Sequence, residues 1–150
     1  MEIAELFPGR EAQISEMQER LSKYAAVERL PLMERQTRTY NSRLAQELGK
    51  WAESQGAGEA FHREVYRTFF VEDGNIALVD ELMRITQKVG LPTDEAREVL
   101  AAHSFAAAVD ADWQRAGELR ITAVPTHLCD GRRLEGFRPY DDFVWLINQG

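Results

Sequence analysis

The sequence predicts a mostly helical chain of the α+β class, in which a β-hairpin and a last helix follow a long helical part. Apolar residues recur at helical spacing up to about residue 119, and a β-rich segment then begins at Ile121. Its 150 residues, 44% hydrophobic and 29% charged, suffice for a folded domain with a hydrophobic core. We therefore expect two parts: a helical domain at 1–120 and a ββα part at 121–150.

The first predicted helix runs from about Glu11 to Glu28. An apolar stripe at positions i, i+3, i+7 and i+10 supports it: Ile14, Met17, Leu21 and Tyr24. Pro31 cannot continue a helix, and residues 30–40 have no clear period, so we expect an ordered connection there.

Five further helices are predicted up to residue 119. Asn41 is expected to cap the second, and Gly56 and Gly90 to end the second and fourth in the left-handed conformation. Thr93 is expected to cap the fifth, with acidic residues in its first turn. The inward-facing residues expected in the third, fourth and sixth helices are Phe61, Val65, Tyr66 and Phe69, then Val79, Leu82, Met83 and Val89, and finally Phe105, Val109, Trp113 and Ala116.

The end of the chain predicts two strands and a helix. Residues 121–129 are expected to form a strand, Asp130-Gly131 a two-residue turn, and residues 132–137 the returning strand. Pro139 can open a last helix that buries Phe143, Leu146 and Ile147. A lone two-stranded sheet is marginally stable and leaves free edges, so we expect something to cover or extend it.

Composition excludes several classes of function. The net charge of −7 disfavours a nucleic-acid partner. A single cysteine, Cys129, cannot form an internal disulfide, and no segment reads as a signal peptide or as a membrane span. We expect a cytoplasmic protein with no membrane partner and no cofactor.

The order and spacing of several short motifs resemble the DsbA family of thiol-disulfide oxidoreductases, most closely its FrnE-like branch. These motifs are Thr39-Tyr40-Asn41-Ser42-Arg43-Leu44-Ala45, Trp51-Ala52, Phe69-Phe70-Val71-Glu72, Val89-Gly90-Leu91, Val109-Asp110-Ala111-Asp112-Trp113 and Val124-Pro125-Thr126. The resemblance implies a helical insertion domain joined to the C-terminal ββα half of a thioredoxin fold. It also implies a cis peptide bond before Pro125.

The departures from this family concern its chemistry. The family's Cys-x-x-Cys and its first strands have no counterpart in these residues, Arg120 stands where the family has a glycine, and Arg138 where it often has glutamine. We therefore expect a truncated oxidoreductase that is redox-inactive alone. One alternative is a non-catalytic module that binds a peptide or a partner, and a weaker one is a relative of the 2-hydroxychromene-2-carboxylate isomerases.

The candidate site that the resemblance implies is Val124, Pro125 and Thr126, whose backbone would pair with an extended peptide or a protein thiol substrate. Cys129 is a weak nucleophile candidate, because it lies on a strand and not at a helix start, so we read it as a small apolar residue. Zinc held by His127, Cys129, His62 and His103 is disfavoured by the spacing, and no metal is predicted.

Two further expectations concern surfaces. We read the aromatic residues Phe61, Tyr66, Phe69 and Phe70 as core, with a peptide groove as the alternative. Because the sheet is incomplete, we expect free strand edges, exposed inner faces on the first and last helices, and a homo-oligomer.

Overall fold

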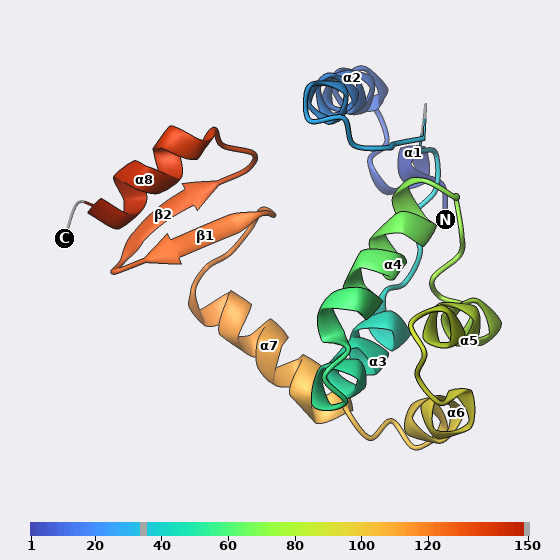
Figure 1. Cartoon of the computed structure of the whole chain (residues 1–150). Helices are drawn as coiled ribbons and strands as arrows, with labels where there is room; N and C mark the ends of the chain where they lie inside the picture. The colour runs from blue at the N-terminus through green and yellow to red at the C-terminus, as the bar shows by residue number, and fades with distance from the viewer. Residues whose placement is uncertain (34–35, 149–150) are drawn as a thin grey trace. The chain divides into compact units, whose positions relative to one another are not determined.

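The computed structural model describes residues 1–33 and 36–148 and divides into two compact units, 1–109 and 110–150 (Figure 1). The first unit holds α1 (Ile3–Leu6), α2 (Glu11–Val27), α3 (Arg43–Ser54), α4 (Gly58–Phe70), α5 (Val79–Lys88) and α6 (Thr93–Ala101). Helix α7 (Ala106–Glu118) begins in the first unit and ends in the second. There β1 (Thr126–Cys129), β2 (Arg132–Glu135) and α8 (Tyr140–Asn148) follow. The mostly helical α+β class is confirmed, whereas the domain boundary at 120/121 stays a prediction.

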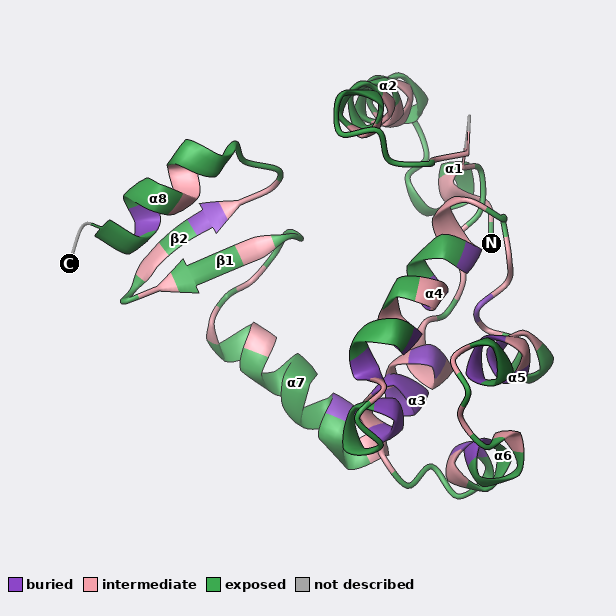
Figure 2. Cartoon of the chain, viewed as in Figure 1, coloured by how far each residue is buried: buried purple, intermediate pink, exposed green. Residues whose placement is uncertain are grey.

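The core of the first unit lies between α3, α4, α5 and α6. Figure 2 shows buried residues gathered on the facing sides of these helices. The largest fully buried apolar side chains there are Phe61, Leu48, Leu82 and Ile85. Helical periodicity predicted this face because a residue and those three and four positions later share one side of a helix.

Most predicted helix ends are confirmed. Ser42 is the N-cap residue of α3, and the side-chain oxygen of Asn41 before it accepts the predicted bond from the Arg43 N–H at 2.9 Å. Gly56 and Gly90 have φ of +74° and +76°. Thr93 was wrongly predicted to cap. It is the first residue of α6, and Pro92 precedes it in extended conformation as the capping residue, without a side-chain bond. The ψ of 117° keeps Pro92 outside the helix, so α6 begins one residue earlier than a cap at Thr93 would imply.

Helix α2 is confirmed, and its apolar stripe is exposed as expected. Met17 is 60% and Leu21 48% accessible to solvent. The preceding short helix α1 was not predicted. It is tied to the 36–40 connection, where the Arg38 guanidinium contacts the Glu2 carboxylate at 2.7 Å.

Four side chains expected to be buried are exposed. Tyr66 is 62%, Val79 37%, Trp113 52% and Ile147 64% exposed. Periodicity indicates which residues share a face of a helix, but not whether another element covers that face. By contrast, Leu82, Met83 and Val109 are buried as predicted.

The second unit consists of an antiparallel hairpin with α8 against it. Thr126 lies opposite Glu135, and Cys129 opposite Arg132 across the Asp130-Gly131 turn. The predicted strands were too long, since residues 121–125 and 136–137 lie outside β1 and β2. In the described residues no other strand flanks the segment before Thr126, so it cannot form a ladder. No helix in the described ranges is long and apolar enough to cross a membrane.

Candidate functional site

The predicted site, Val124-Pro125-Thr126, lies where the chain leaves α7 and enters β1 (Figure 1). The peptide bond between Val124 and Pro125 is cis, as the resemblance implied. Val124 is 87% exposed. The candidate site is therefore a short surface segment, not the wall of a cavity.

Three hydrogen bonds hold this segment. The Thr126 hydroxyl donates to the carbonyl of Ala123 at 2.6 Å, and the Gly136 N–H donates to the carbonyl of Pro125 at 2.8 Å. Before it, the Ile121 N–H donates to the carbonyl of Ala116 at 2.9 Å, which closes the end of α7. Among the described residues, neither the N–H nor the C=O of Val124 forms a backbone hydrogen bond.

Arg133 of β2 ties the end of α7 to the hairpin. Its guanidinium donates to the carbonyl of Arg120 at 3.1 Å and also to that of Leu119. These carbonyls lie just past the last turn of the helix, where the dipole favours a cation. Arg120 has φ of +52°, so an arginine occupies a left-handed position where the resemblance places a glycine.

The hydrogen-bond phase of the hairpin determines which groups of β1 point outward. Pairs in an antiparallel ladder alternate between bonded and non-bonded. Because Pro125 bonds to Gly136, His127 and Cys129 are also in bonded pairs. The N–H and C=O of Thr126 and Leu128 therefore point away from β2. Among the described residues, none of these groups has a backbone partner beyond the strand.

Cys129 ends β1 beside the turn. Its thiol lies 3.7 Å from a carboxylate oxygen of Asp130, and the side chain is half-buried. No second thiol exists in the sequence to resolve a mixed disulfide. A position beside an acid, away from a helix N-terminus, gives no physical reason for an activated thiolate.

The histidines named as zinc candidates have other partners. His127 packs edge-on against Phe143 with ring centroids 4.7 Å apart. His62 contacts Glu53 at 3.2 Å, and His103 contacts Glu47 at 3.0 Å. Over the described ranges, no group of three or more His, Cys, Asp or Glu side chains could hold a metal ion.

The aromatic stripe of α4 is divided between the core and the surface. Phe61 is fully buried, and Phe69 packs at the edge of the core against Tyr40, with ring centroids 6.1 Å apart. Tyr66 lies outside the core beside Phe70. The core interpretation holds for Phe61 and in part for Phe69, and the groove alternative stays a prediction.

A buried ionic cluster was missed by sequence reasoning. The Glu47 side chain is 1% exposed, and it accepts bonds from Arg43 at 2.8 Å and from His103 at 3.0 Å. Burial raises the pKa of Glu47, but the hydrogen bonds from Arg43 and His103 outweigh it, so the pKa lies below the ordinary value. Arg43 also donates to the carbonyl of Ala106 at the start of α7. The i, i+4 spacing of Arg43 and Glu47 was the available signal.

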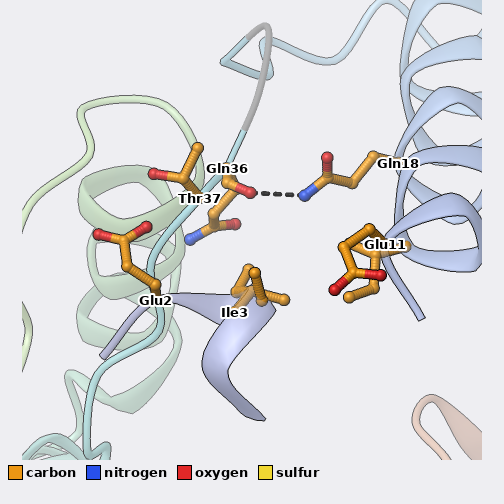
Figure 3. A pocket seen from close by; sticks show the side chains of 8 residues that line it. Glu2, Ile3, Glu11, Gln18, Gln36 and Thr37 are labelled. Carbon is orange, nitrogen blue, oxygen red and sulfur yellow. Dashed lines mark hydrogen bonds between the residues drawn. The ribbon is translucent and has the colours of Figure 1, made fainter. Parts of the chain in front are cut away.

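A small cavity of about 180 Å³ lies between α1, α2 and the 36–37 segment (Figure 3). The Gln18 amide donates across it to the carbonyl of Gln36. Its two carboxylates are engaged, Glu2 by Arg38 and Glu11 by the Gly9 N–H. The buried side-chain nitrogen of Gln36 has no partner among the described residues. One amide nitrogen is too little to define a ligand site.

Comparison with known proteins identifies the family. The model of the DSBA-like thioredoxin domain matches residues 3–148. Among solved structures, a probable DsbA oxidoreductase from Streptomyces coelicolor is similar, with a TM-score of 0.87 and 24% sequence identity. That match covers 99% of this chain and 67% of the other. No curated protein matches the chain. The chain belongs to the DSBA-like thioredoxin domain family.

Proposed function

We propose that this member of the DSBA-like family binds an extended polypeptide along the outer edge of β1, as the peptide-binding part of a thiol-disulfide oxidoreductase. The observation that carries the proposal is the exposed backbone of Val124 beside the cis bond, next to the outward N–H and C=O groups of Thr126 and Leu128. A peptide in extended conformation can add to such an edge as a further strand, through main-chain bonds that tolerate many sequences.

The same proposal assigns no disulfide exchange to these 150 residues alone. Exchange requires an activated thiolate and in most cases a second thiol, and Cys129 is the single cysteine of the sequence. A catalytic dithiol would have to come from another segment or another chain. The assignment to the FrnE-like branch and the cytoplasmic location belong to this proposal and rest on the sequence motifs and the composition.

A non-catalytic binding module is the second candidate, and the exposed backbone of Val124 with the outward groups of Thr126 and Leu128 supports it equally. Both candidates bind peptide, and they differ in whether a dithiol belongs to the natural protein. The DNA upstream of Met1 discriminates between them. A Cys-x-x-Cys encoded in frame there supports the oxidoreductase, and a sequence without one supports the module.

Peptide binding is tested with a cysteine-free, unstructured peptide and NMR-detected hydrogen exchange. We expect the amides of Val124, Thr126 and Leu128 to gain protection on binding. The amides of His127 and Cys129 change little, because they are already bonded within the hairpin.

The matched control is the same peptide with N-methyl groups on alternate residues, which keeps its side chains but removes the pairing donors. We expect affinity to fall at least about tenfold, which is the loss of roughly 1.4 kcal/mol. Equal binding of both peptides would contradict strand addition, and so would protection confined to other residues.

A further inference from the structure

The sequence contains two Asp-Gly pairs, Asp73-Gly74 and Asp130-Gly131. In both pairs the aspartate has a left-handed backbone, with φ of +54° at Asp73 and +48° at Asp130. In an Asp-Gly pair the backbone nitrogen of the glycine can attack the carboxyl carbon of the aspartate with little hindrance, because glycine has no Cβ. The surroundings of each pair therefore decide whether it reacts.

Asp130-Gly131 forms the tip of the hairpin between β1 and β2 (Figure 1). The Asp130 side chain is 81% exposed, and its contacts with the Cys129 thiol and the Arg132 guanidinium are both long, at 3.7 Å. The Gly131 N–H donates to no described residue, and a Cβ placed on Gly131 would have no atom within 4 Å. The nitrogen and the carboxyl carbon that would join are both unhindered.

The exposure of this turn does not depend on what lies beside the hairpin. Cys129 and Arg132 are the last paired residues, and the turn projects beyond them. A further strand next to β1 or β2 would bond to backbone groups within these strands and not to the turn.

The same dipeptide at Asp73-Gly74 is held by the core of the helical unit. The Gly74 N–H donates to the carbonyl of Thr68 at 2.8 Å, so the nitrogen that would attack is engaged. Thr68 is fully buried, and its side chain fills the space in which a Cβ of Gly74 would lie. Reaction at Asp73 therefore requires a local opening of the structure that frees the Gly74 amide.

We propose that Asp130 is a site of spontaneous backbone modification, at which the hairpin turn converts to an isoaspartyl linkage, whereas the fold protects Asp73. The Gly131 nitrogen loses its proton and bonds to the side-chain carboxyl carbon of Asp130, and a carboxyl oxygen leaves as water, which closes a succinimide ring. Water then adds to a ring carbonyl, and the bond from that carbonyl to nitrogen breaks. Cleavage at the side-chain carbonyl restores aspartate, and cleavage at the main-chain carbonyl leaves the chain linked through the side chain. One water leaves and one enters, so the product has the mass of the original chain and solvent is the only other reactant.

The isoaspartyl linkage adds a carbon to the main chain at the tip of a two-residue turn. Such a turn matches the twist of its flanking strands only with particular backbone angles, so the longer link does not fit. The adjacent pair, Cys129 and Arg132, is expected to lose its hydrogen bonds first. We expect hydrogen exchange of the Cys129 amide to rise at least about threefold in the modified chain. Because no peptide ligand takes part in these steps, they occur whether or not the chain binds one.

The test is incubation of the 150-residue chain for several weeks at mildly acidic pH, in buffer and in concentrated urea, followed by peptide mapping. Electron-based fragmentation in a mass spectrometer distinguishes isoaspartate from aspartate. In buffer we expect isoaspartate at residue 130 to form at least about tenfold faster than at residue 73, because a hydrogen bond to buried Thr68 must open there. In urea both pairs lose their surroundings, and we expect the two rates to agree within about threefold.

A methyltransferase that recognises isoaspartate provides a second readout, because it transfers a methyl group from S-adenosylmethionine to the freed main-chain carboxylate. Two matched variants assign the label. Asp130→Ser should remove most of the methylation of the chain stored in buffer, and Asp73→Ser should leave it nearly unchanged. Circular dichroism spectra that match those of the unmodified chain show that both variants are folded, and the peptide map of the unmodified chain needs neither of them.

Three results would overturn the proposal. The first is an equal rate at both aspartates in the folded chain. The second is an Asp130 that stays intact in buffer while the urea sample is modified. The third is a ratio of rates that is the same in urea as in buffer, because the difference would then come from the flanking sequence and not from the fold.

Discussion

Replacing Glu47 by glutamine tests whether the buried ionic cluster stabilises the helical unit. Glutamine keeps the size of the side chain and one acceptor oxygen, but it loses the negative charge that faces Arg43 and His103. A hydrogen bond to a charged group contributes about 1.5–3 kcal/mol, and breaking a buried pair costs about 3–5 kcal/mol. His103 is largely exposed and Arg43 is not fully buried, which places the expected loss near the lower end, at roughly 2–3 kcal/mol.

The assay is urea unfolding followed by the fluorescence of Trp51. This tryptophan is buried on the same helix as Glu47, whereas Trp113 and Trp145 are exposed. With a urea dependence of about 1–3 kcal/mol per molar, the midpoint should fall by roughly 0.7–3 M. Glu53→Gln is the matched control, because Glu53 lies on the same helix but its side chain is about half exposed. This substitution should change the free energy of unfolding by no more than about 0.5 kcal/mol.

The pH dependence of the free energy of unfolding provides a second test of the Glu47 cluster. Because the folded-state pKa of Glu47 lies below its ordinary value of 4.5, its stabilising effect is present above that value and is lost as pH falls through the folded pKa. The difference in the free energy of unfolding between the original protein and Glu47→Gln should therefore shrink below about pH 4. If the free energy of unfolding of Glu47→Gln at pH 7 lies within about 0.5 kcal/mol of the original value, the stabilising role of the buried ionic cluster is refuted.

Three further predictions concern the backbone and the junction at the end of α7. Arg120→Gly should raise the free energy of unfolding by about 1 kcal/mol, because φ is +52° there and glycine adopts that conformation without strain. Arg115→Gly, within α7, is the control and should lower it by a similar amount. Urea unfolding measures both changes. Gly74→Ala should cost about 1–3 kcal/mol, because its Cβ would clash with the Thr68 side chain. Gly117→Ala meets open space within α7 and should stabilise by about 0.5–1 kcal/mol, and a thermal scan of both variants checks this order. Arg133→Met should raise the hydrogen-exchange rate of the Ile121 amide at least about fivefold, which corresponds to roughly 1 kcal/mol. The reason is that the carbonyls at the end of α7 lose the guanidinium that donates to them. An unchanged rate would contradict the role given to Arg133.

The helices could be predicted because their signals are local. Periodicity located α2 to α7, and Asn41, Gly56 and Gly90 marked boundaries through backbone chemistry that each residue carries by itself. The prediction that Thr93 caps α6 was wrong because the neighbouring Pro92 occupies the capping position. The exposure of Tyr66 and Trp113 depends on which other elements cover their faces, and sequence spacing does not contain that information.

The candidate site was predicted from a resemblance and not from residue chemistry. Three consecutive residues, Val124, Pro125 and Thr126, carry no catalytic side chain, and their interest lies in backbone direction. Which backbone groups point outward depends on the bond between Gly136 and Pro125, and a sequence cannot fix that phase without the register of the hairpin. The outward role of Leu128 was missed for the same reason.

The most direct test of the central claim, that these residues bind peptide but perform no disulfide exchange alone, is a reduction assay. Dithiothreitol reduces a small disulfide-bonded protein with and without this chain, beside a Cys129→Ser variant that controls for the single thiol. We predict the same rate in all three reactions. An acceleration by the chain that is lost in Cys129→Ser would show that Cys129 is a working nucleophile, and it would contradict the account.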